Sequence, residues 1–212
     1  MTLPATGVEL DRTGYINVND YLETNVDGVW ALGDITGIMP LKHVAVRQAR
    51  HLIDNLFHGR RRPMTYGAIP HAIFSAPQVA GVGKTEDELK SDGVAYRVGR
   101  WKIENTAMGL ALKESGLVKI LADDSGRILG GHIVGSNASI LIHEIVVSMN
   151  AGGTLDAIID SVHVHPTLSQ VVGLAAIAAR VGPKVSELSA VTEEQAKGYW
   201  DSWTSIPNAD ME

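Results

Sequence analysis

The chain of 212 residues is 45% hydrophobic and 20% charged, which is enough apolar material for the core of a globular protein. Its net charge of −6 at pH 7 argues against general affinity for nucleic acid, because such affinity requires a basic surface. The absence of cysteine excludes disulfide scaffolds, thiolate zinc sites and cysteine nucleophiles within these residues.

The sequence carries no sign of a membrane segment. No apolar run reaches the length of a membrane span, and MTLPATGVELDRTG at the start lacks the apolar core of a signal peptide. We therefore expect a cytoplasmic protein with neither a membrane nor a nucleic-acid partner. The basic run at residues 60–62 is too short to change this expectation and is interpreted as a solvated loop.

The first 62 residues are predicted to hold two short strands and one helix. GYINVND (14–20) alternates polar and apolar residues as a half-buried strand does, and GVWALGD (28–34) reads as an apolar strand. Apolar residues then recur at helical spacing through PLKHVAVRQARHLIDNLF (40–57), which predicts a helix with one apolar face. Gln48 is the one polar residue on that face. Pro40 suits the first turn of this helix.

From residue 63 the pattern of predicted elements changes, and we place a domain boundary there, because prolines and glycines interrupt regular structure. The second domain covers residues 63–182. Runs of strands followed by runs of helices are typical of an α+β domain. The strand candidates are HAIFSA (71–76), VAGVG (79–83), VAYRVGRWKI (94–103), GLALKE (109–114), GLVKILA (116–122) and RILGGHIVG (127–135). The helix candidates that follow are residues 137–152, a short helix at 154–160, and residues 167–180.

Local signals support several of these boundaries. Thr85–Glu88 is a capping box that opens a short helix, and Asp123–Gly126 is a hairpin turn. Ser136 or Asn137 is expected to cap the first long helix of this region, and Thr154 the next. Residues 183–212 form an acidic C-terminal tail, in which the capping box at residues 192–195 predicts a further helix start.

Gly33 and Asp34 end the apolar strand and precede the helix of residues 40–57. A carboxylate at a strand end accepts hydrogen bonds from the hydroxyls of a ribityl or ribose chain, and a helix N-terminus favours an anion. An ordinary turn aspartate is the alternative interpretation. No G-x-G-x-x-G motif is present, so the sequence does not show a complete nucleotide site.

The segment SVHVHPTLSQ (161–170) holds two histidines one residue apart. His163 and His165 point the same way on an extended segment, so a metal site with His143 or Glu144 is one hypothesis, although the spacing matches no strong zinc pattern. Thr167 and Gln170 have the spacing of a capping box. Because His165 lies just before a proline and outside this helix start, its backbone is extended and held at a fixed point, as a general acid or base must be.

Five ordered stretches carry a family resemblance: GYINVNDYLETNVDGVWALGDITG, LKHVA, IPHAIFSAPQVAGVG, GLVKILADDSGRILGGHIVGSNAS and HVHPTLSQ. Together they resemble the C-terminal part of the pyridine nucleotide-disulfide oxidoreductases, and the dihydrolipoamide dehydrogenase-like members in particular. The resemblance covers about residues 3–182. It implies an α+β fold, an antiparallel sheet with helices on one face, preceded by a remnant of an α/β FAD-binding domain.

The resemblance also implies cofactor contacts. Residues 1–62 would be the last piece of the FAD-binding domain, where Asp34, after Gly33, meets the ribityl-phosphate region of FAD. The backbone at Leu41, Lys42 and His43 would face the pyrimidine edge of the flavin. NAD or NADP would be the second cofactor of the intact parent enzyme.

By the same resemblance, residues 63–182 would form a homodimerisation domain whose partner is a second copy of the chain. His165 would reach the partner subunit's active site and carry a proton for a small dithiol or disulfide substrate. The family places a glutamate where this chain has Gln170, and relatives often have a glutamate at Ile140. An amide still orients the His165 ring but brings no charge.

The family's dinucleotide loop, cysteine pair and nicotinamide domain would precede Met1. We therefore expect either a cut piece or a fragmentary gene product that is inactive as a reductase by itself. Two functions follow as hypotheses: a portion of a flavin-dependent oxidoreductase that supplies the interface and the histidine, or a non-catalytic dimerisation module with no chemistry of its own.

Overall fold

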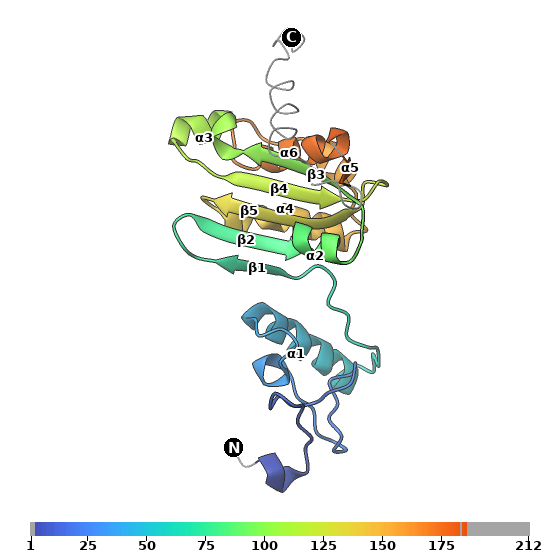
Figure 1. Cartoon of the computed structure of the whole chain (residues 1–212). Helices are drawn as coiled ribbons and strands as arrows, with labels where there is room; N and C mark the ends of the chain where they lie inside the picture. Colours follow the sequence, from blue (N-terminus) through green and yellow to red (C-terminus); the bar gives the residue numbers. More distant parts are fainter. Residues whose placement is uncertain (1–2, 183, 186–212) are drawn as a thin grey trace. The chain divides into compact units, whose positions relative to one another are not determined.

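A computed structural model of the chain describes residues 3–182, 184 and 185 (Figure 1). The chain divides into two compact units, and the change of unit falls after His71. The sequence placed the domain boundary at residue 63. Each unit is described by itself below.

The first unit contains two 3-10 helices and one α-helix: η1 (Leu3–Thr6), η2 (Gly33–Thr36) and α1 (Lys42–Phe57). The two predicted strands are wrong. Leu10 and Ile16 form one isolated bridge, and Glu23 and Trp30 form another. Each bridge joins residues only a few positions apart across a tight turn, so the pairing has no length over which to extend.

Helix α1 confirms the helix predicted at residues 40–57. It begins at Lys42, directly after the N-cap residue Leu41. Pro40 therefore lies outside the helix, although the sequence predicted it in the first turn. Val44 and Gln48 are the residues of α1 that are buried, one turn apart on the same face. Gln48, the one polar residue on the apolar face, is therefore buried where α1 packs on the rest of the unit.

The second unit is built on a six-stranded sheet in the order β1-β2-β5-β4-β3-β6 (Figure 1). The strands are β1 (Pro70–Ile73), β2 (Gln78–Gly83), β3 (Tyr96–Lys102), β4 (Leu117–Ala122), β5 (Ile128–Gly135) and β6 (Lys184–Val185). The pairs β2–β5, β5–β4, β4–β3 and β3–β6 are all antiparallel. The predicted turn at residues 123–126 joins β4 to β5, with the Gly126 N–H donating to the Asp123 carbonyl at 2.9 Å.

Three helices cover one face of this sheet: α4 (Ala138–Asn150), α5 (Leu155–Ile159) and α6 (Gln170–Val181) (Figure 1). Helix α6 approaches β3 so closely that a Cβ on Gly99 would overlap the backbone of Ala175 and Ala179. The expected antiparallel sheet with helices on one face is confirmed.

A short helix, α2 (Glu86–Ser91), packs on the other face. Side chains alternate along a strand, so Tyr96 and Val98 of β3 point away from α6 and pack with Leu89 of α2. The predicted capping box is present at its start, because Thr85 Oγ1 accepts from the Glu88 N–H while the Glu88 carboxylate accepts from the Thr85 N–H.

The strand predicted at GLALKE is wrong, because these residues belong mainly to helix α3 (Ala107–Leu112), which follows η3 (Ile103–Asn105). Thr106 caps α3 by accepting from the Gly109 N–H at 3.1 Å. Gly109 also lies directly against the Ile103 carbonyl, where a Cβ would overlap. The local cap and the missing side chain therefore outweigh the alternating pattern.

The caps predicted for α4 and α5 do not form. Asn137 occupies the N-cap position of α4 without a side-chain cap bond, and Thr154 does the same for α5. Instead, the Gln78 side chain of β2 accepts hydrogen bonds from the Ser139 N–H at 3.2 Å and from its hydroxyl at 2.9 Å. The partner comes from 61 residues away, which explains why local sequence did not predict it.

The predicted C-terminal tail is described in part. Lys184 and Val185 form β6 beside β3. Residue 183 and residues 186–212, with the predicted capping box at 192–195, lie outside the described residues.

Within the described ranges, no helix combines the length and the apolar character that a membrane crossing requires.

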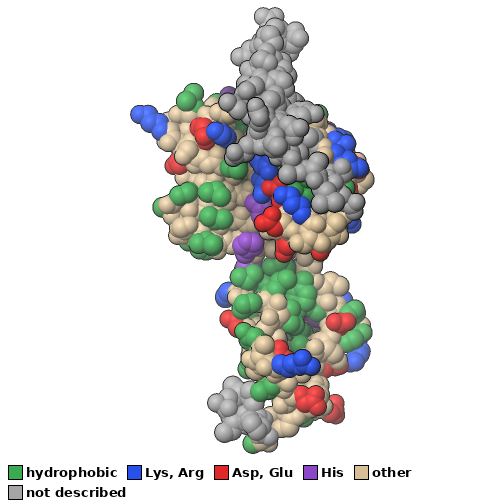
Figure 2. Space-filling model, in the orientation of Figure 1, with side chains coloured by type: hydrophobic (Ala, Val, Ile, Leu, Met, Phe, Trp, Pro, Cys, Tyr) green, Lys and Arg blue, Asp and Glu red, His purple; other side chains and the backbone are tan. Residues whose placement is uncertain are grey.

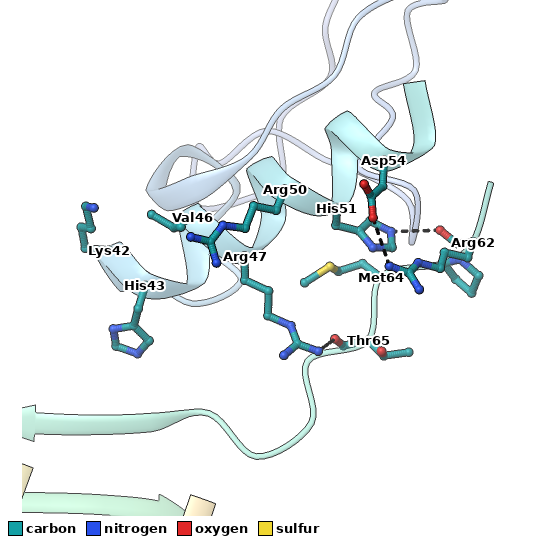
Figure 3. A pocket seen from close by; sticks show the side chains of 11 residues that line it. Lys42, His43, Val46, Arg47, Arg50, His51, Asp54, Arg62, Met64 and Thr65 are labelled. Atoms are coloured by element: carbon teal, nitrogen blue, oxygen red, sulfur yellow. Dashed lines mark hydrogen bonds and ion pairs between the residues drawn. The ribbon is translucent and has the colours of Figure 1, made fainter. Parts of the chain in front are cut away.

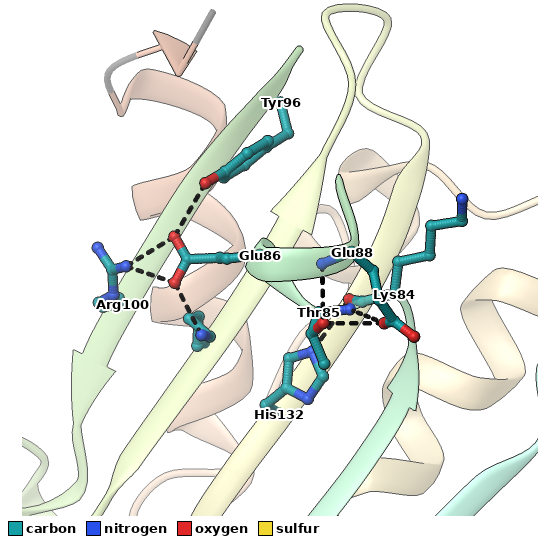
Figure 4. Close-up of polar contacts among 8 residues, drawn as sticks. Lys84, Thr85, Glu86, Glu88, Tyr96, Arg100 and His132 are labelled. Carbon is teal, nitrogen blue, oxygen red and sulfur yellow. Dashed lines mark hydrogen bonds and ion pairs between the residues drawn. The ribbon is translucent and has the colours of Figure 1, made fainter. Parts of the chain in front are cut away.

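A half-buried carboxylate joins α2 to the sheet (Figure 4). Glu86 accepts from Arg100 at 2.8 Å and from Lys119 at 2.8 Å, and the Tyr96 hydroxyl donates to it at 3.3 Å. Burial raises the pKa of the Glu86 carboxyl, but Lys119 and Arg100 outweigh this and lower the pKa below its usual value. Burial and the nearby Glu86 charge raise the pKa of Tyr96 to about 12.

Because the folded-state pKa of Glu86 is lowered, its ion pairs stabilise the protein above the usual glutamate pKa of 4.5 and are lost as the pH falls through the folded value. We expect Glu86→Gln to cost about 1–3 kcal/mol of unfolding free energy at pH 7. The cost should shrink below pH 4.5. Urea denaturation at several pH values measures it. Asp87→Asn, an exposed neighbour on α2, is the control and should change stability little.

Candidate functional site

The segment between α5 and α6 carries the predicted catalytic histidine. His165 is exposed, and its Nδ1 lies 2.9 Å from Oε1 of Gln170, the first residue of α6. The same oxygen accepts from the Thr167 N–H at 3.4 Å. Since an amide oxygen only accepts, Nδ1 must carry the proton, which leaves Nε2 as the ring atom that can take one.

The capping box predicted at Thr167 forms only in part. Gln170 does reach back to the Thr167 N–H, but the Thr167 hydroxyl donates to the Val164 carbonyl at 2.7 Å instead of accepting from α6. Ser169 is the N-cap residue, so α6 begins at Gln170 and not at Thr167. The result is a compact turn in which the Gln170 amide both starts the helix and orients the His165 ring.

His163 is held separately from His165. Its Nε2 lies 2.6 Å from Oε1 of Glu144 on α4, and the two side chains are 15% and 28% exposed. The ring also packs on Gly173 of α6, where a Cβ would lie 3.0 Å from the ring carbon Cε1. His163 thus ties the segment to two helices at once.

This arrangement does not support the metal hypothesis. His163 and His165 contact different partners, Glu144 and Gln170, and His143 is exposed on α4. Among residues 3–182, 184 and 185, no three side chains of metal-binding type converge. Glu144, considered from sequence only as a metal ligand, is instead the half-buried partner of His163, and no local pattern in the sequence indicated that pairing.

Exposed apolar side chains lie on the histidine segment and on α4, the helix that carries the Glu144 partner of His163. Val162 and Val164 are 99% and 72% exposed, and on α4 Ile140 and Val147 are 66% and 67% exposed. Large apolar side chains gathered at one surface commonly mark a contact with another protein. The histidine is therefore displayed on a rigid turn within a surface that has the character of an interface.

The second candidate site lies in the first unit, where η2 packs against α1. Gly33 has a φ of +78°, and its N–H donates to Oε1 of Gln48 at 2.6 Å. Gln48 is completely buried and donates in turn to the Tyr66 hydroxyl at 2.8 Å. With the backbone held in this way, the carboxylate of Asp34 remains exposed.

The start of α1 is open. The N-cap residue Leu41 has no polar side chain and makes no capping bond, so it does not satisfy the backbone N–H groups of the first turn of α1, which include those of Lys42 and His43. The His43 side chain points elsewhere, with Nε2 2.8 Å from the Pro70 carbonyl. The residues predicted to contact a cofactor thus belong to two packed elements of the first unit.

The surface of this unit is also apolar in part. Hydrophobic side chains gather on the visible face of the first unit (Figure 2). Tyr15, Ile35 and Ile38 are among its exposed large side chains, and they lie in or near η2. A surface of this kind is suited to contact with a ligand or with more protein.

Two family descriptions match the chain. "Pyridine nucleotide-disulphide oxidoreductase, dimerisation domain" matches residues 69–176, and "Pyridine nucleotide-disulphide oxidoreductase" matches residues 2–49. The chain is 39% identical over 180 residues to Dihydrolipoyl dehydrogenase 1, mitochondrial, of Arabidopsis thaliana, covering 84% of this chain and 35% of the relative. It is also 39% identical over 180 residues to Dihydrolipoyl dehydrogenase of Corynebacterium glutamicum, covering 82% and 38%.

Solved structures give the same picture. LpdA from Mycobacterium tuberculosis superposes with a TM-score of 0.76 at 28% identity, covering 83% of this chain and 39% of that one. The flavoprotein disulfide reductase RclA from Escherichia coli, at 22% identity and a TM-score of 0.75, shares the fold over 81% of this chain and 40% of its own. The chain thus spans little more than a third of the length of these relatives.

The Glu144–His163 contact makes a specific prediction. In Glu144→Ala the His163 ring loses its partner while remaining largely buried, so the variant should lose about 1–3 kcal/mol of unfolding free energy. Amide hydrogens at residues 162–165 should exchange faster. His143→Ala, an exposed histidine on the same helix, is the matched control and should leave both quantities unchanged. Equal exchange in Glu144→Ala and the wild type would show that the contact does not hold the segment.

Proposed function

The chain belongs to the pyridine nucleotide-disulfide oxidoreductase family, and from this we propose that it is the C-terminal portion of a dihydrolipoamide dehydrogenase-like enzyme. Residues 1–62 supply part of the FAD-binding domain, and residues 63–182 supply the homodimer interface. His165 serves as the acid and base for the dithiol site of the partner subunit. The observation that carries this proposal is the His165–Gln170 contact, which leaves Nε2 exposed within an apolar surface.

In the proposed reaction His165 moves a proton and no electrons. Nε2 takes the proton from one thiol of the dithiol substrate, which leaves a thiolate to attack a disulfide of the parent enzyme. The sulfur that leaves the broken disulfide bond departs as a thiolate, and the proton on Nε2 is available for it. Gln170 keeps the Nδ1 proton in place throughout, so the ring presents one defined nitrogen to the substrate.

The residues of the first unit fit one wall of an FAD site. The exposed Asp34 carboxylate can accept hydrogen bonds from ribityl hydroxyls, and the open N–H groups at Lys42 and His43 offer the positive end of α1 to an electron-rich ring edge. Gly33 keeps the backbone close to α1, since even a Cβ there would lie 3.3 Å from that of Ala45. When bound, FAD would pass the electron pair of the dithiol to NAD or NADP, the cofactors on which the family depends.

A second candidate function is a non-catalytic dimerisation module. The exposed Ile140, Val147, Val162 and Val164 favour an interface whether or not the chemistry takes place. We propose that a second copy of the chain covers them. The cytoplasm remains our proposed compartment, and the names of the relatives include both a mitochondrial and a bacterial protein.

The dimer proposal is tested on the chain itself. Light scattering at micromolar concentration should give about twice the 22.7 kDa chain mass. Val147→Asp should shift the population toward monomer, because it places a charge within the apolar surface. Ile53→Asp changes an apolar residue of α1 that is 48% exposed, and it should leave the dimer intact. A wild-type chain that is monomeric at every concentration would contradict the proposal.

The acid-base proposal is tested in the full-length protein by dihydrolipoamide-dependent turnover across pH. His165→Ala should lower turnover roughly 10²- to 10⁴-fold, because it removes the proton carrier. Gln170→Ala should cost less, because it removes only the orienting contact. Gln170→Glu should speed turnover near neutrality, because a carboxylate beside the ring attracts the proton that the ring must take from the thiol. Wild-type turnover in His165→Ala, with an unchanged melting temperature, would eliminate the catalytic role.

A further inference from the structure

A basic groove runs along the outer side of α1 in the first unit (Figure 3). The cavity has a volume of about 670 Å³ and lies between α1 and the segment Arg62–Thr65. Four of its lining side chains are cationic: Lys42, Arg47, Arg50 and Arg62. We call these four residues and the space between them the α1 groove.

The wall opposite α1 is pinned in place. Arg47 donates to the Thr65 carbonyl at 2.7 Å, and the side chains of His51 and Asn55 each donate to the Arg62 carbonyl at 2.9 Å. The Arg62 N–H donates back to Asn55 Oδ1 at 3.2 Å. The groove is therefore bounded by α1 on one side and by a hydrogen-bonded backbone segment on the other.

The charges in the α1 groove are not balanced. Asp54 is its only carboxylate, and it already contacts Arg60, Arg62 and His58 at 3.6, 3.4 and 3.0 Å. Lys42, Arg47 and Arg50 contact no carboxylate within residues 3–182, 184 and 185. Three uncompensated cations along one helix repel each other, and this occurs in a chain whose net charge is −6.

We propose that the α1 groove binds a small anion that carries two or more phosphate groups. Arg47 and Arg50 offer planar guanidinium forks, which match phosphate oxygens in pairs. Lys42 and Arg50 are separated by eight residues of helix, or about 12 Å at 1.5 Å per residue, so the row of cations suits an extended anion better than a single ion. The positive N-terminal end of α1 adds to the potential.

This site is distinct from the proposed flavin contacts and does not rest on the proposed function. The flavin contacts use Asp34 and the backbone N–H groups at the first turn of α1. The α1 groove uses side chains that begin at Lys42 and continue for two further turns on the exposed side of the helix, away from the buried Val44 and Gln48.

Titration calorimetry of the 212-residue chain with pyrophosphate tests the proposal. The wild type should bind, and its affinity should fall as sodium chloride is raised from about 50 to 300 mM. Arg50→Gln should weaken binding about tenfold or more, since it removes one charge-assisted pair. Arg50 makes no hydrogen bond or ion pair in the described part of the chain, so this variant should keep the wild-type melting temperature.

Arg12→Gln is the matched control, because Arg12 is an exposed arginine of the same unit that lies outside the groove. It should bind pyrophosphate as the wild type does. Absence of binding at millimolar pyrophosphate overturns the proposal, and so does an equal loss in Arg12→Gln and Arg50→Gln, which would indicate diffuse charge attraction.

A parallel titration with ADP distinguishes a site for phosphate groups alone from a site for a nucleotide. Equal affinities for ADP and pyrophosphate, both lost in Arg50→Gln, indicate that the groove recognises phosphates alone. Tighter binding of ADP that is lost in the same variant indicates a nucleotide with further contacts. Binding of ADP that Arg50→Gln leaves unchanged places the nucleotide elsewhere and contradicts this use of the groove.

Discussion

The close approach of α6 to the sheet is the constraint on which the histidine site depends. Gly99 of β3 leaves no room for a side chain beneath Ala175 and Ala179, so α6 lies directly on the strand. Contacts of this kind are short and rigid, because protein interiors are close-packed. Gln170 at the start of α6 is therefore held in place relative to the sheet, and the His165 ring that it orients is held with it.

The contact between His163 and Glu144 adds a second anchor to the same segment. It ties the chain to α4, while Gln170 ties it to α6, so the exposed His165 lies between two fixed points. An exposed side chain normally samples several rotamers. Here the contacts of His163 and Gln170 hold the backbone on both sides of His165, and Gln170 also fixes the orientation of the ring. A fixed orientation suits a group that must meet a substrate in one geometry. The Gln170 amide supplies this orientation without adding a charge.

In the first unit, Gln48 of α1 holds η2 and Tyr66 in place by hydrogen bonds. It is fully buried, yet both ends of its amide are satisfied, by the Gly33 N–H and by the Tyr66 hydroxyl. A buried polar group costs free energy unless its partners are present, so the arrangement specifies how η2 sits against α1. That placement leaves Asp34 and the first turn of α1 exposed, and it turns Arg47 toward Thr65.

The sequence by itself determined the elements whose signals are local. Helix α1, the Thr85 capping box, the Asp123–Gly126 turn and five of the six strands follow from periodicity and turn chemistry among near neighbours. The role of His165 as an acid or base stays a prediction, made from a histidine that stands before a proline and a helix start. The sequence failed at GLALKE, where a strand-like pattern is overridden by the Thr106 cap and by Gly109 against Ile103.

Only the tertiary structure decided the contacts between distant residues. Gln78 caps α4, Glu144 pairs with His163, and Arg47 meets the Thr65 carbonyl, and none of these pairs is close in sequence. Hydrogen bonds and ion pairs act over a few ångströms, whereas sequence patterns report only which residues are apolar and at what period. Which polar side chains meet is settled when the helices and strands pack, and that packing gave the two histidines of one short segment separate partners, Glu144 and Gln170.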